Sequence, residues 1–169
     1  MIFVTVGSQL PFDRLIKAVD EMVPEFGDNE VVAQVYDMKY EPRNIRTVEF
    51  LTPIEYQSYI SQADLVISHA GMGTILTVSE LGKPLIVFPR SGDLKETRNN
   101  HQVATCRMLE QQGLLHAAYT IDDLREKVKD FRQGKLQPTP PIPHFASTRL
   151  IESVRMFISG APQELRTAA

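Results

Sequence analysis

The chain has 169 residues, of which 43% are hydrophobic and 23% are charged, and its formal net charge is -3. This length fits one domain with one core, and the charge lacks the basic excess of proteins that bind nucleic acid. The single cysteine, Cys106, excludes an internal disulfide and, without a Cys/His cluster, argues against structural zinc, so a reducing, cytoplasmic setting fits best.

Short apolar runs alternate with amphipathic patterns of helical period along the whole chain. The strands we expect, in chain order, cover residues 2–6, 31–36, 45–51, 65–67, 85–88 and 114–117. The helices we expect cover residues 12–23, 53–62, 74–81, 100–112, 120–134 and 148–159, with loops at residues 37–44 and 90–98. This alternation predicts an α/β fold with a doubly wound, mostly parallel, Rossmann-like sheet and helices on both faces.

A proline-rich connector, residues 137–145, separates the domain of residues 1–136 from the C-terminal helix and tail of residues 146–169. Because proline removes a backbone donor, the connector cannot continue a helix and is semi-rigid. One face of the C-terminal helix carries Leu150, Ile151, Val154, Phe157 and Ile158. We expect this apolar face either to dock on a partner or to pack within its own domain.

Membrane attachment would need such a partner. The apolar start, residues 1–6, lacks the basic residues of a signal peptide and is too short to span a bilayer. No later apolar run approaches the roughly 20 residues that a transmembrane helix requires.

The most informative stretch is the strand, glycine turn and helix around His69-Ala70-Gly71-Met72-Gly73-Thr74. Its glycines permit tight backbone geometry, and the helix that follows ends at Gly82 and Pro84. The free N–H groups at the start of this helix form a ready anion site beside His69. We expect this site to hold the diphosphate of a nucleotide-sugar, and we expect Gly7 and Ser8 to face the same sheet edge.

A dinucleotide-binding fingerprint is the main alternative for this stretch. Gly71 and Gly73 match its first two glycines, but Leu76 stands at the third small position. The strand over residues 85–88 is followed by Pro89 and Arg90 instead of the acidic residue that binds a ribose 2′-hydroxyl. Arg90 would suit a 2′-phosphate, so an NADP-binding Rossmann protein remains an alternative.

Three motifs, taken in order, resemble the nucleotide-sugar-binding half of glycosyltransferase family 28. They are His69-Ala70-Gly71-Met72-Gly73-Thr74, Gly82-Lys83-Pro84-Leu85-Ile86-Val87 and Asn100-His101-Gln102. The N-terminal run Val4-Thr5-Val6-Gly7-Ser8-Gln9-Leu10-Pro11-Phe12 is similar to a narrower group within it. That group is the catalytic subunit of the bipartite UDP-GlcNAc transferase of N-glycan assembly, with its bacterial PssE-type relatives.

The resemblance implies that this domain is the C-terminal, donor-binding half of a GT-B glycosyltransferase. The implied activity is inverting transfer of a sugar from a UDP-sugar to a lipid-linked acceptor in glycan or exopolysaccharide biosynthesis. No cofactor is implied, and the chain contains no Asp-X-Asp pair, which favours metal independence. Because the first strand begins at residue 2, a membrane-anchored partner subunit would supply the acceptor half and hold the chain at the cytoplasmic face of the membrane.

The resemblance also assigns roles to individual residues. It places the donor diphosphate at His69, Gly71, Met72, Gly73 and Thr74, uracil at Phe50 and Leu51, ribose at Thr77 or Glu80, and the donor sugar at Asn100, His101 and Gln102. Gly7 and Ser8, at the same sheet edge, would touch the diphosphate or the acceptor side. Related enzymes carry the ribose-binding carboxylate at the position of Thr77. Here Glu80, one turn later on about the same helical face, would substitute for it, or Thr77 would bind the ribose more weakly.

No residue stands out as the catalytic base that inversion requires. The local candidates are His101, Glu96 and Asp13, whereas single-chain relatives take the base from the acceptor half. A non-catalytic nucleotide-binding or regulatory module is therefore a second alternative, and the replacement of the expected carboxylate by Thr77 is its best support.

Overall fold

Within the described residues, six short strands form one sheet in which every pair of neighbours is parallel. The computed structural model describes residues 1–142 and 145–160. The strands are β1 (Ile2–Thr5), β2 (Val31–Gln34), β3 (Arg46–Val48), β4 (Leu65–Ser68), β5 (Leu85–Val87) and β6 (His116–Ala117). Their order is β3-β2-β1-β4-β5-β6, so the strand order reverses between β1 and β4. The predicted doubly wound, Rossmann-like α/β fold is confirmed.

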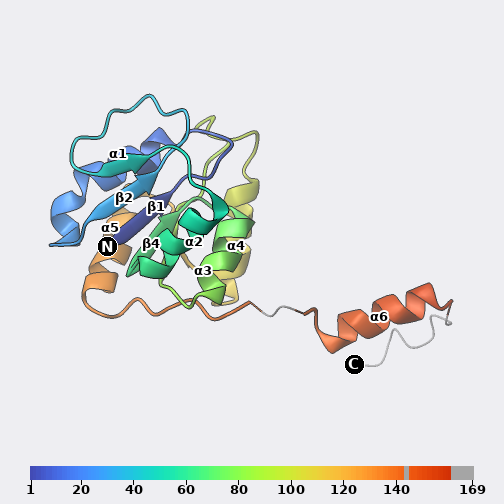
Figure 1. Cartoon of the computed structure of the whole chain (residues 1–169). Coiled ribbons are helices and arrows are strands. Elements are labelled where there is room, and N and C mark those ends of the chain that lie inside the picture. Colours follow the sequence, from blue (N-terminus) through green and yellow to red (C-terminus); the bar gives the residue numbers. More distant parts are fainter. Residues whose placement is uncertain (143–144, 161–169) are drawn as a thin grey trace.

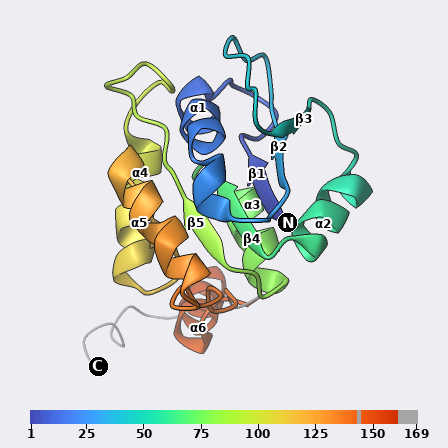
Figure 2. The same ribbon diagram turned by 90° about the vertical axis from the view of Figure 1, so that its left-hand side faces the viewer.

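Helices cover both faces of this sheet (Figures 1 and 2). They are α1 (Asp13–Glu21), the 3-10 helix η1 (Val23–Phe26), α2 (Pro53–Gln62), α3 (Met72–Glu80), α4 (His101–Gln111), α5 (Ile121–Arg132) and α6 (Thr148–Ile158). One apolar cluster joins α1, η1 and α5 to the sheet, and a second joins α2, α3 and α4 to its other face. Because strand side chains alternate, Ile2 and Val4 belong to the first cluster and Phe3 to the second.

Many element boundaries differ from the prediction by one to three residues, and three of these differences affect the arrangement most. The helix expected over residues 12–23 ends at Glu21 and is followed by η1, which contains Pro24 in its first turn; proline cannot continue an α-helix. The strand expected over residues 45–51 covers only Arg46–Val48, because residues 49–51 leave the sheet to line a cavity. Helix α3 begins at Met72 instead of Thr74, with Gly71 as its N-cap.

Helices α2 and α5 each begin with a capping box. The Thr52 hydroxyl accepts a hydrogen bond from the backbone of Glu55, whose carboxylate accepts one from the backbone of Thr52. Thr120 and Asp123 make the same reciprocal pair at the start of α5. Each box satisfies donors that a helix start leaves unpaired, so both helix positions are set locally.

The C-terminal region begins with a docked segment. Thr139 is buried, and the Ser79 hydroxyl donates to the carbonyl of Pro140 (2.9 Å) and accepts from the backbone N–H of Ile142 (3.0 Å). These bonds fix the first part of the predicted connector to the end of α3. Residues 143–144 of the connector and the predicted tail from residue 161 lie outside the described residues, so the proposed region boundaries stay a prediction.

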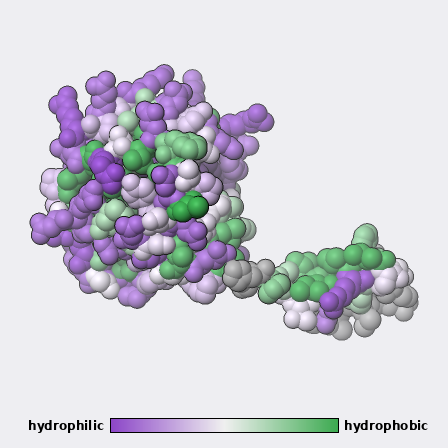
Figure 3. Space-filling view, in the orientation of Figure 1, coloured by the Kyte–Doolittle hydropathy of each residue, from purple (hydrophilic) through white to green (hydrophobic). Residues whose placement is uncertain are grey.

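Helix α6 stands apart from the sheet and its helices (Figure 1). None of its residues is buried, and its N-cap Ser147 accepts a hydrogen bond from the backbone of Leu150. Figure 3 shows apolar side chains gathered along this helix. Across the described ranges, no helix has both the length and the apolar character needed to cross a membrane.

Candidate functional site

A cavity of about 640 Å³ opens at the carboxyl edge of the sheet, next to the point where the strand order reverses. Open α/β sheets bind their ligands at this edge and at this reversal. The cavity is lined by the segments that follow β1, β2 and β3 and by residues of α2 and α3. Among the predicted site residues it brings together Gly7, Ser8, Phe50, Leu51, Gly73, Thr74 and Thr77.

His69, which follows β4, is wedged between two glycine turns beside this cavity. A Cβ on Gly7 would lie 2.8 Å from Cε1 of the His69 ring, and a Cβ on Gly71 would lie 2.7 Å from the same atom. Gly7 also has a φ of +77°, a backbone conformation that other residues rarely adopt. Glycine is therefore required at both positions, because the imidazole packs directly against both backbones.

The imidazole of His69 is neutral at neutral pH. Burial first, and the positive charge of Arg90 second, lower its pKa to about 4. Its Nδ1 atom is buried and has no hydrogen-bond partner among the described residues. A neutral ring can donate only one N–H, so His69 can act on an anion as a hydrogen-bond donor but not as a cation.

The start of α3 supplies backbone donors to the cavity. As at any helix start, its first N–H groups have no acceptor within the helix, and Gly71 offers no side-chain cap. The Thr74 hydroxyl shares a hydrogen bond of 2.7 Å with the hydroxyl of Tyr56 on α2. The Thr77 hydroxyl donates to the carbonyl of Gly73 (2.9 Å) and keeps its lone pairs for a ligand. This arrangement can bind an anion through fixed backbone dipoles.

Two buried polar side chains fix the turn after β1 through hydrogen bonds to its backbone. Gln34 donates to the carbonyl of Gly7 (3.1 Å) and accepts from the hydroxyl of Thr5 (2.7 Å). The same Thr5 hydroxyl accepts from the N–H of Gly7 (3.3 Å). Neither Thr5 nor Gln34 belongs to the predicted site, although a polar residue at the end of an otherwise apolar buried strand is the signal that could have identified them.

Arg90 holds the same turn from the other side. One nitrogen of its guanidinium donates to the carbonyls of Val6 (2.8 Å) and Leu10 (2.6 Å). The side chain is buried. The guanidinium is thus engaged by backbone carbonyls and is not presented at the surface, where the NADP alternative would need it to contact a 2′-phosphate.

The other end of the cavity is aromatic. Phe50 lines it and is 82% exposed. Tyr36 and Tyr56 line the same cavity, together with the carboxylate-bearing Glu49. A flat aromatic face beside a site for anions suits a ligand that carries a planar ring at one end and phosphate at the other.

Comparison with known proteins identifies the family. Residues 1–153 match the glycosyltransferase family 28 C-terminal domain. The chain belongs to this family. The resemblance seen in the motifs is thereby confirmed, and it covers the cavity and most of the chain.

Curated relatives agree with this assignment. The chain is 35% identical over 123 residues to the UDP-N-acetylglucosamine transferase subunit ALG13 of Mus musculus, covering 67% of this chain and 10% of that protein. It is 28% identical over 145 residues to the UDP-N-acetylglucosamine--N-acetylmuramyl-(pentapeptide) pyrophosphoryl-undecaprenol N-acetylglucosamine transferase of Caldicellulosiruptor saccharolyticus, covering 78% of this chain and 38% of that one. The chain thus spans well under half of either relative.

Solved structures show the same fold. An NMR structure of ALG13 superposes with a TM-score of 0.56 at 22% identity, covering 90% of this chain and 93% of that one. A crystal structure described as the glycotransferase of kitacinnamycin gives 0.56 at 20% identity, covering 95% and 40%. At these identities the likeness concerns the fold alone, and it agrees with the Rossmann-like α/β fold of glycosyltransferase structures.

The residues that family 28 suggests for the donor sugar do not line the cavity; they lie at the start of α4. Asn100 accepts from the N–H of Gly92 (2.8 Å). His101 is exposed, and its ring shares a hydrogen bond of 2.7 Å with Asn99. Gln102 is buried and accepts from the backbone N–H of Arg90 (3.0 Å). Their direct role toward a sugar stays a prediction, while Asn100 and Gln102 shape the loop that precedes α4.

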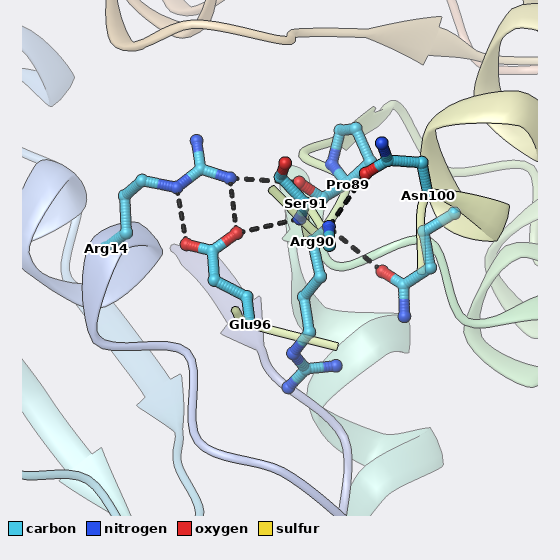
Figure 4. A network of polar contacts seen from close by, with 8 residues as sticks. Arg14, Pro89, Arg90, Ser91, Glu96 and Asn100 are labelled. Atoms are coloured by element: carbon cyan, nitrogen blue, oxygen red, sulfur yellow. Dashed lines mark hydrogen bonds and ion pairs between the residues drawn. The ribbon is translucent and has the colours of Figure 1, made fainter. Parts of the chain in front are cut away.

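The candidate bases are engaged to different degrees. Glu96 accepts two hydrogen bonds from Arg14 (2.6 and 2.8 Å) and one from the N–H of Ser91 (2.8 Å), as Figure 4 shows. The carboxylate of Asp13 accepts from the backbone of Lys39 at 3.2 Å. A catalytic base must accept a proton, and this would break the ion pair of Glu96. The contacts of Glu96 therefore fit a role in holding the loop over residues 91–96 better than a role as the base.

Of the two ribose candidates, Thr77 lines the cavity, whereas Glu80 is exposed and does not line it. Met72 is also exposed, at the first position of α3. Within residues 1–142 and 145–160, no group of three or more His, Cys, Asp or Glu side chains is placed to hold a metal ion.

Proposed function

We propose that the chain binds a UDP-sugar in the cavity at the strand reversal and is the catalytic, donor-binding subunit of an inverting glycosyltransferase. The observation that carries this proposal is a single cavity that joins the aromatic Phe50 end to the glycine turns of Gly7 and Gly73. Uracil would lie against Phe50 and Leu51, the ribose at Thr77, and the diphosphate at the start of α3. The membership of family 28 supports the reaction class.

The geometry suits departure of UDP. In the transition state the leaving diphosphate gains negative charge, and donors that are already fixed stabilise this charge without rearrangement. The N–H groups at the start of α3 are fixed by the helix, and the Gly7 turn is fixed by Gln34 and Arg90. His69 would add one neutral N–H donor at the same place.

The acceptor half would come from a membrane-anchored partner subunit, which would hold this chain at the cytoplasmic face of the membrane. The ALG13 relatives, which are named as subunits of a transferase, support this part of the proposal. The exposed apolar face of α6 supplies a surface for such an assembly. The acceptor would be a lipid-linked sugar in exopolysaccharide or glycan biosynthesis, and the base that takes its hydroxyl proton would come from the partner, as in the single-chain relatives.

Calorimetric titration with UDP, UDP-sugars and NADPH tests the donor site. We expect micromolar binding of UDP compounds and none of NADPH; binding of NADPH alone would overturn the proposal. A non-catalytic nucleotide-binding module would also bind UDP, and Thr77 in place of the family's carboxylate favours that second candidate. Sugar transfer to a lipid-linked acceptor, measured with and without a co-expressed partner, separates the two.

A further inference from the structure

Arg90 combines deep burial with a position directly behind the Gly7 turn. Its side chain is only 3% exposed. The guanidinium bridges the carbonyls of Val6 and Leu10, the two ends of the turn, and lies 4.9 Å from the ring centroid of Phe12. Its Nε atom is buried and has no hydrogen-bond partner in the part of the chain that the structure describes.

The charge of Arg90 is not neutralised by an ion pair. Across residues 1–142 and 145–160, no carboxylate forms a salt bridge with it. The nearby Glu96 pairs with Arg14 instead, as Figure 4 shows. Burial lowers the pKa of Arg90 to about 10, so the side chain still carries its proton at neutral pH. The charge of Glu96 opposes this lowering, but that carboxylate pairs directly with Arg14. A buried cation without an ion-pair partner of its own is costly, so its charge calls for an anion.

The field of Arg90 reaches the candidate site. After burial, the charge of Arg90 is the second cause that lowers the pKa of His69, whose ring packs against Gly7 and Gly71. Gly7 lies between the two carbonyls that Arg90 binds, and it lines the cavity. The positive charge therefore stands behind the surface at which a phosphate would lie.

We propose that Arg90 is the fixed counter-charge of this anion site. It positions the Gly7 turn and attracts the diphosphate of a nucleoside diphosphate from behind that turn, without touching the ligand. The inference rests on the proposed function. If Arg90 acts in this way, the site is selective between ligands: a positive charge behind the turn favours binding of UDP over binding of uncharged uridine. Loss of local packing alone would weaken the binding of both ligands alike.

The test compares three substitutions in the full chain by titration with UDP and with uridine. Arg90→Gln keeps a donor for the turn but removes the charge, and we expect UDP binding to weaken by about tenfold or more with uridine binding unchanged. Arg90→Lys keeps the charge and an ammonium whose three donors can serve the two carbonyls, so its affinity for UDP should stay within about threefold of the native value. The matched control is Arg125→Gln, which removes an arginine that pairs with Glu25 and does not line the cavity, and it should leave the UDP-to-uridine ratio unchanged.

Equal weakening of UDP and uridine in Arg90→Gln, or a loss as large in Arg90→Lys, would overturn the inference. If Arg90→Gln does not fold, the affinity of Arg90→Lys for UDP tests the inference: a value within about threefold of native supports it, and a loss of about tenfold or more overturns it. If the native protein binds no UDP, the proposed function fails. The effect of Arg90 on the site is then tested separately by measuring the pKa of the His69 ring in an NMR titration. Removal of the Arg90 charge should raise the pKa of His69, and an unchanged pKa would refute the inference.

Discussion

Replacing Gly71 with alanine would place a methyl group 2.7 Å from Cε1 of the His69 ring. Side-chain carbons do not approach this closely, and the ring cannot retreat, because Gly7 packs against it from the other turn. Overpacking of this kind costs about 1–3 kcal/mol. For a chain of this size, that loss lowers the melting temperature by roughly 2–12 °C, which calorimetry or circular dichroism would measure.

Gly73→Ala is the matched control, two positions along the same turn. A Cβ on Gly73 would meet no atom within 4 Å, and alanine is favoured over glycine in a helix by up to about 1 kcal/mol. We therefore expect native or higher stability. Because Gly73 lines the cavity, the same methyl group should weaken UDP binding by about tenfold or more. Equal melting temperatures for the two variants would refute the packing of His69 described above, and native UDP affinity in Gly73→Ala would refute the placement of the diphosphate.

Three further outcomes follow from the site and from α6. Phe50→Ala, which truncates an 82% exposed side chain, should leave the melting temperature unchanged but weaken binding of UDP, and not of inorganic diphosphate, by about 1–3 kcal/mol in calorimetry. The folded-state pKa of His69, about 4, lies below its unfolded value of about 6.5, so between these pH values the unfolded state binds more protons than the folded state. The free energy of unfolding, measured with urea, should therefore fall by up to about 3 kcal/mol as the pH drops from 6.5 to 4. The fall should be smaller in His69→Gln, which lacks this titrating group. Deletion of residues 145–169 should leave the melting temperature of the domain unchanged and abolish co-purification with a partner subunit, whereas retained co-purification would place the docking surface elsewhere.

The elements around the site follow from local sequence. The β-branched run before His69, the glycines after it and the Gly82 and Pro84 stop define β4, α3 and β5, and the structure has all three in these places. The N-caps of α2 and α5 likewise involve residues only three positions apart. Because these signals act within one or two turns of chain, a single sequence contains them in full.

The polar support of the site depends on contacts between distant parts of the chain. Gln34 and Gly7 are 27 positions apart, and Arg90 and Val6 are 84 positions apart. Arg90 had suggested a surface contact with phosphate, but its burial is decided by how the segment after β5 crosses the turn after β1. Ser79 was likewise unremarkable in the sequence, yet it fixes residues 140 and 142 from α3. Such pairings appear only once the strand order is known.

Helix α6 has a thermodynamic consequence for assembly. It contains 11 residues and buries none of them, and an isolated helix of that length is marginal in water. Its helical content in solution therefore depends on what covers its apolar face, so docking is coupled to folding. The free energy needed to order the helix reduces the net free energy of binding, and burial of its apolar face gives binding a negative heat-capacity change. A complex held through α6 should accordingly dissociate more readily than its contact area suggests, with an affinity that varies strongly with temperature.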